Sequence, residues 1–130
     1  MTHFLEIPLE PADPETFVGP AHIRLLAAAE ADVSVKLYYV RFEPGGRTNW
    51  HAHAGTQILV VREGRCRFQE EGGPVRELAA GESVRVESGV RHWHGAAPDA
   101  HADHVAVNLE IRETFWFEPV AEADYLRAPG

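Results

Sequence analysis

Glycine and proline recur so often between residues 44 and 95 that this stretch leaves no room for a long helix. Turns are expected at 44–46, 64, 72–74, 81, 89 and 95. The runs between and around these turns are short and rich in branched and aromatic residues: 33–42, 57–62, 65–70, 75–78, 82–86 and 104–111. Such runs between tight turns predict an antiparallel sandwich or barrel, and therefore an all-β fold. The run 22–29 fits either a strand or a short helix.

The composition limits the partners of this chain. Lysine and arginine number 12 against 20 aspartates and glutamates, a net charge of −8, so there is no basic stripe to bind nucleic acid. No apolar run approaches the roughly 18 residues of a membrane span. Cys66 is the single cysteine, which excludes an internal disulfide and is typical of a reducing cytoplasm. We expect a cytoplasmic protein that binds neither nucleic acid nor membrane.

Two of the runs have apolar side chains on both faces. In 33–42 the alternating sets are Val33, Val35, Leu37 and Tyr39 against Tyr38, Val40 and Phe42. In 104–111 they are Val105, Val107, Leu109 and Ile111 against His104, Ala106, Asn108 and Glu110. A strand that is apolar on both faces must be covered on both, by a second layer or a second subunit. We therefore expect a homodimer or a higher homo-oligomer.

Two pairs of histidines are spaced two residues apart, His51 with His53 and His92 with His94. Eight histidines placed at random would give roughly 0.5 such pairs. Residues i and i+2 of a strand project from the same face about 7 Å apart, so two imidazoles can converge on one cation. Gln57 has the same parity as His53 and offers a carbonyl oxygen. The alternative is that these histidines are structural residues of the core or surface.

The spacing of these residues resembles the two sequence motifs of the cupins. The first motif is matched by Gly45-x5-His51-x-His53-x3-Gln57-x6-Gly64, with Gln57 where most cupins have glutamate. The second is matched by Gly81-x5-Glu87-x-Gly89-x2-His92-x3-Ala96, with Glu87 in place of proline and Ala96 in place of asparagine. The resemblance implies a cupin double-stranded β-helix, a jelly-roll barrel, as one domain over 1–130. Its barrel would span about 33–112, with an N-terminal arm at 1–32 and a C-terminal tail at 113–130.

The same resemblance implies a metal site. Its ligands would be His51, His53, Gln57 and His92, around manganese, iron, nickel, cobalt or zinc. Three imidazoles and an amide are all neutral, so a divalent ion would keep its full charge and attract anions such as alkoxide or cyanide. Four ligands on a six-coordinate ion leave two positions open, whereas zinc is more often closed by four. Manganese or iron is therefore favoured.

A longer stretch resembles the bacterial manganese-dependent cupin hydroxynitrile lyases, which add cyanide to aldehydes or split cyanohydrins. The stretch comprises Phe42-Glu43-Pro44-Gly45-Gly46-Arg47-Thr48-x-Trp50-His51-x-His53 and His92-Trp93-His94-Gly95-Ala96-Ala97-Pro98. The resemblance implies that His104 is the general base and that Tyr38, Val40, His94 and Asn108 line the substrate pocket. Two of these positions depart from the family, because Asn108 replaces a longer glutamine and Tyr38 replaces a small residue and would narrow the pocket.

Three functions remain open from the sequence. The first is lyase chemistry on a small cyanohydrin, with His104 moving the proton, which requires that His104, Ala106 and Asn108 face the cavity rather than Val105 and Val107. The second is a metal-dependent dioxygenase that binds substrate and O₂ at the two open positions. The third is a non-catalytic domain in which the metal stabilises a small-ligand site.

Overall fold

The computed structural model describes residues 8–130, and nearly all of the regular structure in this range is β-strand. One small helix, α1 (Glu122–Tyr125), lies near the C-terminus. The strands are β1 (Glu10–Pro11), β2 (Phe17–Val18), β3 (Ala21–Ala29), β4 (Val35–Phe42), β5 (Arg47–Thr48), β6 (His51–Glu70), β7 (Arg76–Ala79), β8 (Ser83–Val86), β9 (His92–Ala96) and β10 (Ala102–Trp116). The expected all-β fold is confirmed.

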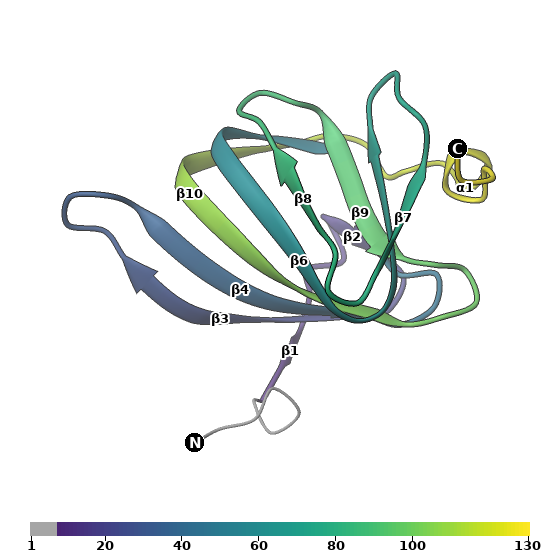
Figure 1. The fold of residues 1–130 in the computed structure, drawn as a ribbon, viewed down its shortest axis with the longest axis horizontal. Helices are drawn as coiled ribbons and strands as arrows, with labels where there is room; N and C mark the ends of the chain where they lie inside the picture. Colours follow the sequence, from purple (N-terminus) through teal and green to yellow (C-terminus); the bar gives the residue numbers. More distant parts are fainter. Residues whose placement is uncertain (1–7) are drawn as a thin grey trace.

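The strands form a single curved sheet (Figure 1). Its order is β1-β3-β4-β10-β6-β9-β5-β2, with β7 and β8 also paired to β6. Strand β6 organises this arrangement because it pairs with β10 along most of its length, with β8 through its first half and with β7 through its second half. It also pairs in parallel with β9 at both of its ends. The sheet therefore curls around β6 and encloses an interior.

The run 57–70 was expected as two strands separated by a turn at Gly64, and this prediction is wrong. Strand β6 continues through Gly64, and β10 shifts its register by one residue beside it. Gly64 has φ +80°, and a Cβ there would lie 1.9 Å from the carbonyl oxygen of His101. The glycine therefore allows a close approach of two backbones within the sheet. The open alternative at 22–29 resolves as strand β3, which pairs with β4.

The inward-facing side chains form the core. One cluster of buried residues includes Val40, Phe42, Val61 and Cys66, and another includes Leu59 and Phe68. In the second half of β6, Cys66 and Phe68 are fully buried. Burial raises the pKa of the Cys66 thiol to about 12, so the thiol is a packing group rather than a reactive one.

The C-terminal segment packs on the outside of the sheet. The Tyr125 ring lies 4.2 Å from the Arg47 guanidinium carbon, and Arg67 Nη1 donates to the carbonyl oxygens of Tyr125 and Arg127. Trp50 and Trp93 pack with Tyr125 in a third buried cluster. No helix among residues 8–130 has the length and apolar character to cross a membrane.

The division into arm, barrel and tail stays a prediction. Within the expected arm at 1–32, β3 is part of the sheet, and residues 1–7 lie outside the described range. Strand β10 continues past 112 to Trp116, where it pairs with the start of β6. The sheet that carries the site therefore includes residues on both sides of 33–112.

Candidate metal centre

Three buried histidines come together where β6 begins beside β9. His51 and His92 are partners in the parallel pairing of these strands, and their ring centroids are 4.2 Å apart. The His53 ring lies 4.9 Å from that of His51 and 5.0 Å from that of His92. One nitrogen from each of the three rings lies within 4.8 Å of the other two. Two separate motifs of the sequence therefore supply one cluster of imidazoles.

The hydrogen bonds of two of these rings fix which nitrogen carries the proton. His51 Nδ1 lies 2.9 Å from the carbonyl oxygen of Asn49, and His92 Nδ1 lies 2.9 Å from that of Val90. A carbonyl oxygen can only accept, so each Nδ1 carries the hydrogen and each Nε2 presents a lone pair. His92 Nε2 is buried without a hydrogen-bond partner, as is Nδ1 of His53. Buried unpaired nitrogens are expensive, and a cation would satisfy them.

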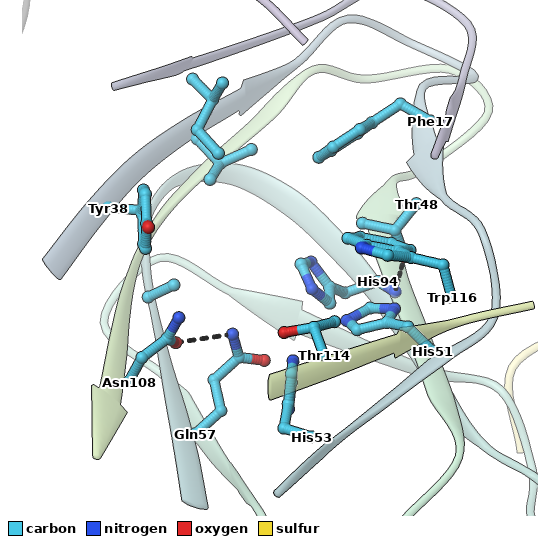
Figure 2. A pocket seen from close by; sticks show the side chains of 13 residues that line it. Phe17, Tyr38, Thr48, His51, His53, Gln57, His94, Asn108, Thr114 and Trp116 are labelled. Carbon is cyan, nitrogen blue, oxygen red and sulfur yellow. Dashed lines mark hydrogen bonds between the residues drawn. The ribbon is translucent and has the colours of Figure 1, made fainter. Parts of the chain in front are cut away.

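Gln57 completes the set through its carbonyl oxygen. Its Nε2 donates to Oδ1 of Asn108 over 2.9 Å, which turns Oε1 away from Asn108. Figure 2 shows Oε1 on the same side as the rings of His51 and His53. Oε1 is buried and has no hydrogen-bond partner. Three of the four residues expected as ligands, His53, Gln57 and His92, thus have a buried unpartnered nitrogen or oxygen, and His51 lies in the same cluster, so the set fits a divalent metal.

Burial keeps these histidines neutral. It lowers the pKa of His53 and of His92 to about 4, and the neighbouring His92 contributes to the shift of His53. The pKa of His51 lies well below its ordinary value, mainly because of burial and then because of His92 and His53. Neutral imidazoles are the form that binds metal. The described residues that line the cavity include no aspartate or glutamate, so no carboxylate there would offset the charge of a bound ion.

The cluster opens into a cavity of about 230 Å³ (Figure 2). Its wall includes the four residues expected for the substrate pocket, Tyr38, Val40, His94 and Asn108. Ala106 and Asn108 line it, whereas Val105 and Val107 are on the opposite face of β10, so the orientation that turns His104 inward is the one observed. The wall also contains residues that were not expected from the sequence: Phe17, Ile23, Thr48, Thr114 and Trp116.

His104 lies behind His94 rather than on the cavity wall. Its Nε2 is 3.0 Å from Nδ1 of His94, and it is fully buried. The backbone amide of His94 donates to the Thr48 hydroxyl, and this bond holds the backbone of His94 in place. Burial lowers the pKa of His104 to about 4, and burial together with His104 places the pKa of His94 well below its ordinary value. The pair is therefore neutral, and His94 is the member that faces the cavity.

The curved sheet and its histidine cluster define a class of protein. Residues 38–108 match the family model of the cupin domain, more than half of the chain, and the protein belongs to the cupin family. The expected jelly-roll fold is thereby confirmed.

Individual relatives narrow the comparison. The chain is 40% identical over 119 residues to an (R)-mandelonitrile lyase from Granulicella tundricola, covering 90% of this chain and 89% of that enzyme. A cupin-like protein from Thermotoga maritima superposes with a TM-score of 0.85 at 36% identity, covering 88% of this chain and 89% of the other. The polyketide cyclase RemF from Streptomyces resistomycificus has a TM-score of 0.71 at 21% identity over 96% of this chain and 89% of its own. This last likeness shows the fold alone.

Proposed function

We propose that the protein is a metal-dependent lyase that cleaves or forms a small cyanohydrin. The observation that carries this proposal is the His94–His104 pair, which meets the same cavity as the three-histidine cluster. The 40% identity to an (R)-mandelonitrile lyase supports it. A divalent ion held by His51, His53, Gln57 and His92, for which we propose manganese, would supply a Lewis acid.

In this proposal the imidazole pair holds and returns one proton. For cleavage, the substrate hydroxyl gives its proton to His94, which is neutral and faces the cavity. The bond between the hydroxyl-bearing carbon and the nitrile then breaks, and its electron pair leaves with cyanide. The proton returns to cyanide as hydrogen cyanide, and an aldehyde remains. His104 acts through its hydrogen bond to His94: in this proposal His94 Nδ1 carries the hydrogen and donates it to Nε2 of His104, which leaves the other nitrogen of His94 free to accept the substrate proton and lets the pair share the positive charge.

The test begins with metal analysis and a cyanide-release assay on mandelonitrile. We expect one metal ion per chain and cyanide release that falls by about 10²-fold or more in His94→Ala and in His104→Gln, as loss of a general base requires. Metal content should not change in either variant. His101→Ala is the matched control because His101 pairs with Glu63 away from the cavity, and its activity should equal that of the unmodified protein.

Other outcomes separate the alternatives. Oxygen uptake with a small organic substrate, without cyanide release, would replace this proposal with a dioxygenase. A metal-free preparation that is fully folded and unchanged by added metal would contradict both enzyme proposals.

We also propose that the protein works in a reducing compartment such as the cytoplasm. Cys66 is the single cysteine, is fully buried and forms no disulfide. Fractionation of the source cells, with the protein detected by antibody, tests this location. Recovery outside the cytoplasm would contradict it.

A further inference from the structure

Thr114 lies on the cavity wall beside the histidine cluster, and the chemistry proposed above does not use it. It lies near the end of β10, where this strand pairs with β6 again after its shift in register. Its cross-strand partner is His53, and the next inward-facing pair is Trp116 with His51. The side chain of Thr114 therefore comes to the cavity through the same pairing that positions two of the expected metal ligands.

The hydroxyl of Thr114 makes no hydrogen bond with another residue in the range 8–130. Figure 2 shows its oxygen directed toward the carbonyl oxygen of Gln57 and the ring of His53. Thr114 is half-buried, so the hydroxyl is shielded by the strand behind it and faces the cavity in front. A hydroxyl carries one hydrogen to donate, and here that hydrogen has no acceptor within the described part of the protein.

The other polar groups of the wall hold different positions. Oδ1 of Asn108 accepts the hydrogen bond that orients Gln57, and the hydroxyl of Thr48 accepts one from the backbone of His94. Figure 2 shows Tyr38 across the cavity from Thr114. Thr114 therefore presents a hydroxyl on the side of the cavity where the expected metal ligands lie.

The chemistry of the wall favours an anion as the partner of this hydroxyl. The described residues that line the cavity include no aspartate, glutamate, lysine or arginine, and burial keeps the three clustered histidines neutral. The carbonyl oxygen of Gln57 and the imidazole nitrogens would be occupied by a divalent cation, so they would not accept from Thr114. The hydrogen of Thr114 is then left for a molecule in the cavity, and a hydrogen bond to a charged acceptor contributes more than one to a neutral acceptor.

We propose that Thr114 is a catalytic residue whose hydroxyl donates a hydrogen bond to a small anion bound beside the histidines. This inference rests on the proposed function for the identity of the anion, which is the cyanide that leaves the cyanohydrin. When the carbon–carbon bond to the nitrile breaks, its electron pair stays on cyanide, and the Thr114 hydroxyl stabilises that charge until cyanide takes the proton from His94. The hydroxyl keeps its own proton throughout.

Azide tests this anion site without turnover. Azide is a linear anion with a terminal nitrogen acceptor, as cyanide is, and the electron paramagnetic resonance spectrum of the manganese-loaded protein during its addition gives a dissociation constant. We expect Thr114→Val to weaken azide binding by about tenfold, the loss for one hydrogen bond to a charged group. Thr114→Ser keeps the hydroxyl and should bind azide within about twofold of the unmodified protein.

Thr56→Val is the matched control. It makes the same chemical change on β6, next to Gln57 in the sequence, at a residue that does not line the cavity, so azide affinity should not change. Competition with a chelator measures the metal affinity of each variant, which should equal that of the unmodified protein. A Thr114 that acted only on the Gln57 carbonyl would instead lower metal affinity in Thr114→Val and leave the azide affinity of the loaded protein unchanged, which would contradict the proposal.

The remaining outcomes separate the anion site from the lyase function. Equal azide affinity in Thr114→Val and the unmodified protein would overturn the anion site, as would the absence of azide binding to the unmodified protein. If Thr114→Val does not fold, Thr114→Ala removes the same hydroxyl and makes the same comparison. A loss of azide affinity that serine restores, in a protein that never releases cyanide, would support the anion site and contradict the lyase function.

Discussion

Asn49 and Val90 perform the same task in the two motifs, although neither side chain takes part. Each residue stands two positions before a histidine, and its carbonyl oxygen accepts the hydrogen of that histidine's Nδ1. The lone pair on Nε2 is thereby presented before any metal arrives, which reduces the cost of ordering the site on binding. The turn that precedes each strand therefore sets the chemistry of the first ligand on that strand.

Asn108 orients the side chain of Gln57, as the backbone carbonyls of Asn49 and Val90 orient the two histidines. We predict that Asn108→Leu lowers metal affinity between about tenfold and a hundredfold, because the carboxamide of Gln57 loses the acceptor that orients it. Asn108→Asp keeps an oxygen that can accept the same hydrogen bond and should not weaken metal binding. Competition with a chromogenic chelator measures the metal affinity of the two variants and of the unmodified protein. Equal affinity in Asn108→Leu and the unmodified protein would show that Gln57 needs no orientation or is not a ligand.

The buried histidines should also make the metal-free protein sensitive to acid. The pKa of His104 is lowered to about 4 by burial, so the unfolded chain binds a proton more readily than the folded one once the pH falls below about 6.5. The folded state keeps its full stability above about pH 6.5 and loses the contribution of neutral His104 as the pH falls toward 4. One such histidine removes about 2 kcal/mol of stability between pH 7.5 and pH 5.

Urea unfolding of metal-free protein at these two pH values measures this effect. The loss on acidification should be smaller in His104→Gln than in the unmodified protein by about 2 kcal/mol, since glutamine does not titrate. Parallel losses in the two proteins would mean that His104 takes up a proton equally readily in the folded and unfolded states, so that folding does not lower its pKa.

The expected ligands were predictable because their spacing is a local property of the chain. His51, His53 and Gln57 share the parity of one strand, and His92 follows its own turn at the spacing of the second motif. That His104 lies behind His94 was not predictable, because their rings meet only through the curvature of the sheet, in which β9 and β10 are separated by β6. Spacing along the chain identifies candidate ligands, and only the packing shows which of them meets the cavity.

At the scale of the elements, strands β6 and β10 lie together over far more of their length than the sequence indicated. The 104–111 run was expected to end at Ile111, but β10 continues to Trp116 after a shift in register between Leu109 and Glu113. Glu110 has φ +57° in this irregular stretch, and a Cβ added at Gly55 would lie 2.6 Å from the carbonyl oxygen of Glu110. The irregularity returns β10 to pairing with β6 and brings Thr114 and Trp116 to the cavity. The charged residues Glu110, Arg112 and Glu113 around Ile111 therefore concealed the continuation of the strand.

Gly64 allows the other close approach of β6 and β10, and we predict that Gly64→Ala destabilises the fold strongly. Its added Cβ would lie 1.9 Å from the carbonyl oxygen of His101, so the two strands must separate. The cost is about 3 to 4 kcal/mol, the sum of an unfavourable φ and overpacking. Gly89→Ala is the control, because Gly89 has nearly the same φ and nothing within 4 Å of the added carbon. It should cost only about 1 kcal/mol.

Urea or thermal unfolding of both variants separates backbone conformation from close approach. Equal losses in Gly64→Ala and Gly89→Ala would show that positive φ alone explains the requirement at Gly64. The continuous strand β6 would then not depend on the contact with His101.

At the scale of the whole molecule, the outward side of the sheet remains apolar. Pairing places Leu37, Ile58, Val60, Val105 and Val107 on one outward face of β4, β10 and β6, which we call the outer face. Val60 is 38% exposed, and the others are half-buried. The arginines at its border, Arg41, Arg62 and Arg85, are each paired with an acidic residue of the same chain. An identical outer face therefore meets no uncompensated charge, although the chain as a whole carries −8.

We predict that two copies of the chain associate through the outer face. Light scattering after size-exclusion chromatography should give about twice the chain mass of 14.4 kDa. Val107→Lys places an ammonium group at the centre of the face and should return the mass to that of one chain, because a buried unpaired charge is costly. Leu126→Lys makes the same change in charge at a residue that is 52% exposed beside α1, away from the face, and should leave the dimer intact. If the unmodified protein is monomeric at micromolar concentration, the prediction is wrong and the apolar outer face has another role. If both lysine variants dissociate to single chains, net charge rather than this face controls association.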